Sequence, residues 1–145
     1  MKGFGVFGGY IAGNKFEIDC IRSFAPNFIF TTSLPPCIAA ASQASIAFLK
    51  NRHDLRESLH ETAKLIKNEL EKNDIPVYKN PSHIIPIFIG DAVKAKLASD
   101  MLIKEFKIYL QPINFPTVNK GEEILRISPT PNHTQEMVDK LVQAL

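Results

Sequence analysis

The clearest hydrophobic pattern in the chain lies between residues 54 and 72, where apolar side chains recur every three or four residues. This spacing places them on one side of a helix that begins at Asp54. An amphipathic helix of this kind needs a core to pack against, so the segment is expected to belong to a folded domain. The apolar stripe consists of Leu55, Leu59, Ala63, Ile66 and Leu70.

Four further helices are predicted from apolar spacing and from capping residues. One covers residues 14–24 and begins at an asparagine that can cap it, and one covers residues 35–50, with two prolines in its first turn. Another runs from an aspartate cap through residues 91–106, and the last covers residues 135–145. The side chains of the last helix that are expected to point inward are Met137, Leu141, Val142 and Leu145.

Short segments rich in β-branched and aromatic residues predict strands. Pro86 interrupts one of them, which favours an edge strand or a bulge. From residue 54 onward, helices and strands follow one another in an order that suits an antiparallel or mixed sheet with helices packed on one face, an α+β fold. The expected strands are residues 6–11, 28–32, 84–89, 108–110 and 123–128.

The first 50 residues do not belong to this α+β pattern. They carry glycines and two expected strands that need further strands to pair with, and a two-stranded remnant is marginally stable alone. We therefore expect residues 1–50 to be a remnant of a larger domain and residues 51–145 to be a small α+β domain. On this interpretation, sequence upstream of residue 1 is missing.

Composition narrows the classes of function. The 145-residue chain is 45% hydrophobic and 22% charged, as is usual for a folded globular protein. Its net charge of +2 comes with scattered basic residues, which argues against a nucleic-acid or membrane-surface partner, and no apolar run reaches the ~18 residues of a membrane span. Cys20 and Cys37 lack metal-ligand spacing and are expected to be buried free thiols in a reducing compartment, the cytoplasm or the interior of an organelle.

Four stretches, in order along nearly the whole chain, carry motifs. The first holds KGFG followed by GGYI, and the second is a strand and turn with two threonines and two prolines. The third contains SHIIPI, and the fourth leads from INFPTV through GEE to LRISPTP. The stretches are residues 2–11, 28–36, 81–87 and 113–131. Together they resemble the α-oxoamine synthases, pyridoxal-phosphate enzymes that join an amino acid to an acyl-CoA.

The resemblance implies a PLP-dependent aminotransferase-like fold. Residues 51–145 would be its C-terminal small domain, and residues 1–50 would be part of the large domain that binds pyridoxal phosphate. The last two stretches point to a member that condenses glycine with succinyl-CoA, as a homodimer with a site shared between subunits. Two alternatives stay open: another member of the family, such as the one that acetylates glycine or the one that forms 8-amino-7-oxononanoate, and a non-catalytic α+β module that binds a partner.

The resemblance also assigns roles to five residues. Lys2 corresponds to the family's lysine that holds the cofactor covalently and removes a proton from glycine. Thr31 and Thr32 correspond to a pair that binds the cofactor phosphate of the neighbouring subunit. Arg126 corresponds to the arginine that grips the carboxylate of glycine, and Thr117 corresponds to a loop threonine that contacts the succinyl carboxylate.

Plainer interpretations compete with these roles. Lys2 taken alone would be a solvated lysine, and threonines suit the end of a strand. Arg126 alternates with apolar neighbours, and its alternative role is a structural ion pair with Glu122 or Glu123. Because only one residue precedes Lys2, the groups that the family supplies from upstream are absent, and the chain alone is expected to be inactive.

Overall fold

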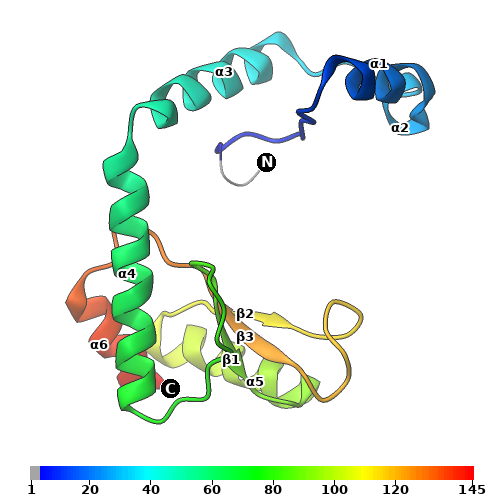
Figure 1. Cartoon of the computed structure of the whole chain (residues 1–145). Coiled ribbons are helices and arrows are strands. Elements are labelled where there is room, and N and C mark those ends of the chain that lie inside the picture. The colour runs from blue at the N-terminus through cyan, green and yellow to red at the C-terminus, as the bar shows by residue number, and fades with distance from the viewer. Residues whose placement is uncertain (1–3) are drawn as a thin grey trace. The chain divides into compact units, whose positions relative to one another are not determined.

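The computed structural model describes residues 4–145, which divide into two compact units (Figure 1). The first unit ends at His53, and the second comprises Asp54–Leu145. This boundary lies close to the one expected from the sequence, but the assignment of the two parts to a large and a small domain stays a prediction. Lys2 lies outside the described residues.

The first unit holds three helices, α1 (Lys15–Phe24), α2 (Pro26–Ile29) and α3 (Pro36–Lys50). Helix α1 begins with a reciprocal cap between Asn14 and Glu17. The Asn14 side chain accepts a hydrogen bond from the Glu17 N–H at 3.0 Å, and the Glu17 carboxylate accepts one from the Asn14 N–H at 3.1 Å. The structure confirms the helices predicted over residues 14–24 and 35–50.

The two strands expected in this unit are wrong. Residues 6–11 form irregular structure, and residues 28–32 are the end of α2 and the turn that follows it. A strand needs a hydrogen-bonded neighbour, and no strand lies in the described part of this unit. Local signals also oppose extension, because Pro26 starts a helical turn and Gly8 has a φ of +104°.

The described part of the first unit has no core of its own. None of residues 4–53 is buried, although many of them are large and apolar. Cys20 and Cys37 are free but exposed, so the expectation that they would be buried is wrong. The exposed large apolar side chains are Phe7, Tyr10, Ile11, Phe16, Phe24, Phe28, Ile29, Phe30, Leu34, Ile46 and Phe48.

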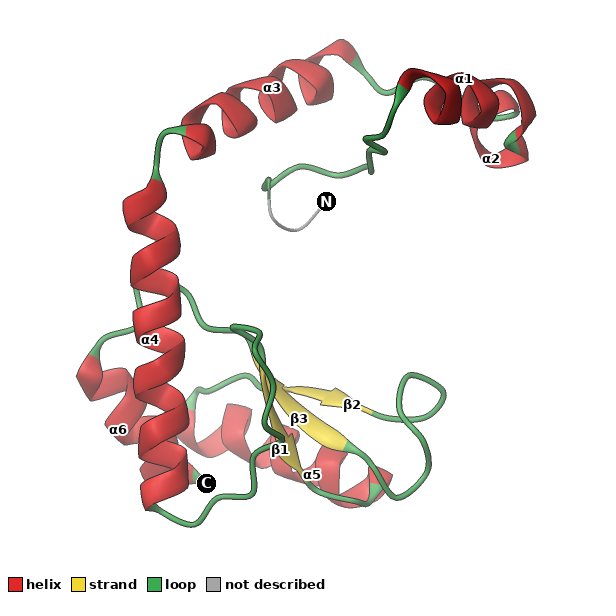
Figure 2. Ribbon diagram, in the orientation of Figure 1, coloured by secondary structure: helices red, strands yellow, loops and turns green. Residues whose placement is uncertain are grey.

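The second unit combines helices with a three-stranded antiparallel sheet (Figure 2), which confirms the α+β prediction. The strand order is β1-β3-β2, so Pro86 lies in an edge strand of this sheet, as its sequence predicts. The elements are α4 (His53–Lys72), β1 (Ile85–Phe88), α5 (Ala92–Met101), the π-helical turn η1 (Leu102–Phe106), β2 (Gln111–Ile113), β3 (Ile124–Ile127) and α6 (Gln135–Ala144).

The expected strand at residues 108–110 is displaced, because β2 begins at Gln111. Lys107 adopts the left-handed conformation at φ 61° and ends the helical segment, so the chain needs several residues to reach the sheet. The Leu110 carbonyl is used elsewhere. It accepts a hydrogen bond of 2.7 Å from the buried Ser99 hydroxyl, which ties α5 to the segment before β2.

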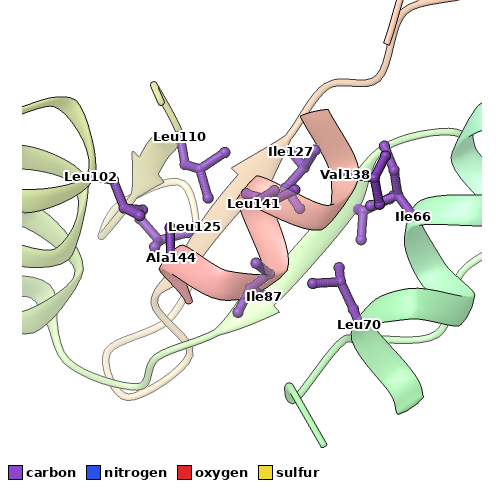
Figure 3. Packing of buried hydrophobic residues seen from close by; sticks show 11 residues of the cluster. Ile66, Leu70, Ile87, Leu102, Leu110, Leu125, Ile127, Val138, Leu141 and Ala144 are labelled. Atoms are coloured by element: carbon purple, nitrogen blue, oxygen red, sulfur yellow. The ribbon is translucent and has the colours of Figure 1, made fainter. Parts of the chain in front are cut away.

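The core lies between the sheet and the helices (Figure 3). Alternate residues of β1 and β3 enter it, together with side chains from α4, η1 and α6. In α6 the buried side chains are Val138, Leu141 and Ala144. Leu141 was expected there, but Met137 and Leu145 are exposed, so for these two the expectation is wrong.

No helix within residues 4–145 has both the length and the apolar content that crossing a membrane requires.

Candidate active site

Arg126 projects from the face of the sheet that points away from the core. It lies in the central strand β3, between Leu125 and Ile127, whose side chains are buried in the core. Because side chains alternate along a strand, the Arg126 side chain belongs to the opposite face. Its cross-strand neighbours on that face are Pro86 of β1 and Gln111 of β2. The sequence pattern predicted this placement.

The guanidinium of Arg126 has an unmet donor. The Nε atom is buried, and no acceptor in residues 4–145 reaches it. The ion pair considered from the sequence does not form, because Glu122 accepts from the Asn119 side chain at 2.9 Å and Glu123 accepts from the Gly121 N–H at 2.9 Å. A buried donor without a partner is costly, and a carboxylate matches the planar guanidinium fork.

Thr117 lies in the loop over residues 114–123, which joins β2 to β3. Its N–H donates to the Asn114 carbonyl at 3.0 Å, while its side chain is exposed and its hydroxyl has no hydrogen-bond partner among the described residues. Thr117 and Arg126 therefore belong to one β-hairpin. Arg126 pairs with Gln111 at the base of this hairpin, and Thr117 lies in its tip.

Thr31 and Thr32 lie between α2 and α3 and are both exposed. The N-cap position of α3 is Pro35, which offers no side-chain cap to the first turn. Hydroxyl groups just ahead of an uncapped helix N-terminus suit an anion such as a phosphate. These threonines belong to the first unit, so neither unit by itself brings all four described candidates together.

Two polar groups of the loop were not assigned their environments from the sequence, which considered Glu123 only as an ion-pair partner of Arg126 and did not single out Asn114. Glu123 is a buried carboxylate, and Asn114 has a buried Oδ1 atom with no hydrogen-bond partner within residues 4–145. The only sequence signal for Glu123 was its position just before β3, which does not distinguish it from Glu122. No three His, Cys, Asp or Glu side chains gather as metal ligands in the part of the chain that the structure describes.

Comparison with known proteins places the chain in a family. Residues 2–145 match the family model described as aminotransferase class I and II. The chain belongs to this family. A 5-aminolevulinate synthase of Rhodobacter capsulatus is 50% identical over 99% of this chain, and a mitochondrial 5-aminolevulinate synthase of Emericella nidulans is 52% identical over 99% of it. The chain spans 36% and 22% of these two relatives, respectively, about a third of their length or less.

Solved structures agree on the fold. Serine palmitoyltransferase of Sphingomonas wittichii matches 97% of this chain with a TM-score of 0.84 and 24% identity, and the chain covers 36% of it. An 8-amino-7-oxononanoate synthase from Francisella tularensis matches 90% with a TM-score of 0.74 and 28% identity, and the chain covers 38% of it. The predicted fold class is thereby confirmed for this member of the family.

Proposed function

We propose that this chain is part of a 5-aminolevulinate synthase that condenses glycine with succinyl-CoA and releases CoA and CO2. The supporting observation is the relationship itself, because curated 5-aminolevulinate synthases from bacteria and fungi are about half identical to the chain over 99% of its length. The second unit adds a physical argument, since the outer face of its sheet carries Arg126, whose buried Nε has no hydrogen-bond partner among residues 4–145. Glycine has the carboxylate that such a cation needs.

The residues of the chain fit pyridoxal phosphate and the two substrates. Pyridoxal phosphate supplies an electron sink for negative charge at the α-carbon of an amino acid. Thr31 and Thr32 would bind its phosphate through their hydroxyls, and Lys2 would hold it covalently. The exposed hydroxyls ahead of the uncapped helix α3 are the chemistry that a phosphate requires.

Arg126 and Thr117 act on the substrates in this proposal, and Lys2 has a second task. Arg126 binds the carboxylate of glycine through its unmet Nε and the rest of the guanidinium fork, which fixes the α-carbon in space. The amine of Lys2 removes a proton from that carbon. Thr117 donates its hydroxyl to the terminal carboxylate of the succinyl group, and the loop that carries Thr117 limits the access of water.

We further propose a homodimer with the site shared between subunits. The first unit supports this, because apolar side chains such as Phe16 and Phe24 are exposed and require a cover. The compartment is proposed to be the cytoplasm in a bacterial source or the interior of an organelle in a eukaryotic one. Of the two relatives described above, one is bacterial and one is fungal, and the fungal enzyme is described as mitochondrial.

The test uses the longer protein that contains this chain, assayed for CoA release from glycine with either succinyl-CoA or acetyl-CoA, and for 5-aminolevulinate as the product with succinyl-CoA. We expect product with succinyl-CoA, and we expect Lys2→Ala to abolish it while Lys15→Ala, an exposed lysine at the start of α1, leaves it unchanged. A preference for acetyl-CoA would move the chain to another member of the family. Full activity in Lys2→Ala would refute the assigned role.

The chain alone is proposed to be inactive, and its visible spectrum with added pyridoxal phosphate tests this. We expect weak binding spread over surface lysines, with no difference between the native chain and Lys2→Ala. A stoichiometric absorption band that needs Lys2 and changes on addition of glycine would show that the chain forms a working site by itself.

A further inference from the structure

Glu123 is the only charged side chain that is buried among residues 4–145, with 4% of its surface exposed. It occupies the last position of the loop, directly before β3. A buried carboxylate is usually paired with a cation, but no lysine or arginine of the described chain lies within ion-pair distance of Glu123. Its Oε2 instead accepts one hydrogen bond, from the Gly121 N–H at 2.9 Å.

The backbone of Glu123 strengthens this attachment. Its carbonyl accepts hydrogen bonds from the N–H groups of Ile89 and Gly90, both at 2.9 Å, just beyond the end of β1. Side chain and main chain of one residue thus connect the end of the loop to the edge of the sheet. A hydrogen bond to a charged acceptor is about twice as strong as a neutral one, so the Gly121 contact is the strongest single hydrogen bond of this connection.

Gly121 must adopt a special conformation to reach Glu123. Its φ is +87°, in the region that glycine adopts without strain. A Cβ atom placed on Gly121 would meet nothing within 4 Å, so the requirement for glycine is one of backbone conformation and not of space. The loop end next to Gly121 is also closed by Asn119, whose carbonyl accepts from the Glu122 N–H at 3.0 Å and whose side chain donates to the Glu122 carboxylate.

The opposite end of the loop is less completely bonded. The Asn114 carbonyl accepts from the N–H groups of Thr117 and Val118 at 3.0 and 3.4 Å, but its buried Oδ1 has no donor in the described chain. One end of the loop is therefore fixed by a buried charge, and the other retains an unmet acceptor. This asymmetry indicates which end holds the loop in place.

We propose that Glu123 is a positioning residue, whose buried carboxylate fixes Gly121 and thereby holds Thr117 where it meets the carboxylate of the acyl substrate. This inference rests on the proposed function for the substrate, while the Glu123–Gly121 attachment stands on the structure alone. Glu123 does not touch the substrate and acts through the loop. The proposed binding of the substrate glycine to Arg126, at the base of the hairpin, does not depend on Glu123.

The attachment is tested first in the 145-residue chain by NMR hydrogen exchange of the Gly121 amide. We expect Glu123→Ala to speed exchange of this amide about tenfold or more relative to core amides of β3, since its charged acceptor is lost. Glu122→Ala is the matched control, because Glu122 accepts a hydrogen bond from the exposed Asn119 side chain and from no other side chain within residues 4–145, and it should leave the amide within about twofold. Unchanged exchange in a folded Glu123→Ala chain would overturn the proposal.

The positioning role is tested by steady-state kinetics of the longer protein. We expect Glu123→Ala to raise the KM for succinyl-CoA about tenfold while the KM for glycine stays within about twofold, and Glu123→Gln, which keeps an acceptor oxygen, to restore most of the loss. Equal changes in both KM values would indicate a general structural effect and overturn the proposal.

A second variant tests the proposal even if Glu123→Ala does not fold. Gly121→Ala leaves the core untouched, meets no atom, and disfavours the φ of +87°, so it should produce the same selective rise in the KM for succinyl-CoA. Wild-type kinetics with Gly121→Ala would overturn the proposal. A wild-type enzyme that does not use succinyl-CoA at all would refute the proposed function instead, and the exchange experiment would still decide the attachment.

Discussion

Two side chains of α6, one turn apart, provide a sharp test of how the second unit is stabilised. Leu141 is 7% exposed and belongs to the core cluster, whereas Met137 is 53% exposed, although the hydrophobic pattern of the helix placed both inward. We therefore expect Leu141→Ala to be strongly destabilising and Met137→Ala to be nearly neutral. The two variants share the helix and the residue created, so differences in helix propensity are small.

The magnitude for Leu141→Ala follows from what the substitution removes. Three carbon atoms leave a nearly fully buried site, which at ~0.8 kcal/mol per methylene gives about 2.4 kcal/mol. The cavity left behind brings the total to about 3 kcal/mol, within the range measured for buried leucines. Met137→Ala should change the free energy of unfolding by less than about 0.5 kcal/mol, because the side chain is mostly in solvent already.

Urea denaturation followed by circular dichroism measures both values in the 145-residue chain. The cooperative transition should report the second unit, since none of the described residues of the first unit is buried. The expected loss for Leu141→Ala corresponds to a drop in Tm of roughly 12–24 °C for a domain of this size. Equal destabilisation by the two variants would refute the placement of α6 on the core.

Single contacts lead to three more expectations. In the longer protein, Arg126→Lys should raise the KM for glycine about tenfold or more, because an ammonium group cannot reproduce the guanidinium fork, and an unchanged KM in steady-state kinetics would contradict the role. Ser99→Ala should destabilise the chain by about 1–3 kcal/mol in urea melts, because the Leu110 carbonyl loses its buried donor, and a change below about 0.5 kcal/mol would count against that hydrogen bond. The hydrogen bond and the charge of Lys140 hold the pKa of Glu136 below its ordinary value, so Lys140→Ala should raise that pKa in a carboxyl NMR titration. Since the pKa is lowered in the folded state, the stabilisation by this pair is present above the unfolded-state pKa and is lost as the pH falls through the folded-state pKa. An identical carboxyl titration in both proteins would exclude the interaction.

Local interactions explain which elements were predictable from the sequence. The caps of α1 and α5 are formed within three residues, by Asn14 with Glu17 and by Asp91 with the Lys94 N–H at 2.8 Å. Such contacts depend on neighbouring residues alone, so the pattern that predicts them is complete in the sequence. The strand predictions in the first unit were wrong for the opposite reason. A strand needs a hydrogen-bonded partner strand, which can be distant in the sequence or absent from the described residues, so the local pattern alone does not decide it.

The rotation of α6 and the start of β2 show a second limit. The periodicity of α6 is compatible with burial of either Met137 or Val138, and only packing against the core selects Val138. Strand β2 begins only at Gln111 because Lys107 adopts the left-handed conformation. Glycine usually adopts this conformation, and no composition rule would assign it to lysine. In both cases tertiary packing decides between local alternatives.

For the candidate site, the alternation of β3 was sufficient to place Arg126 on the open face, because period two follows from strand geometry alone. Its unmet Nε was not predictable, since Glu122 and Glu123 were nearby carboxylates of equal standing in the sequence. The structure shows that these two carboxylates have different environments. One is an exposed partner of Asn119, and the other is a buried acceptor for Gly121.

The two faces of the sheet separate stability from the proposed chemistry. The inner face of β3 contributes Leu125 and Ile127 to the core, and these side chains stabilise the unit whether or not a substrate is present. The outer face carries Arg126, whose unmet donor opposes folding by an amount of about 1–3 kcal/mol. A domain can carry such a deficit only if its core compensates for it, and a bound carboxylate would remove the deficit. The free energy of binding glycine would thus include a hydrogen bond to a donor that the fold has already buried. The apolar inner face of β3 supplies the stability that allows its outer face to carry this charge.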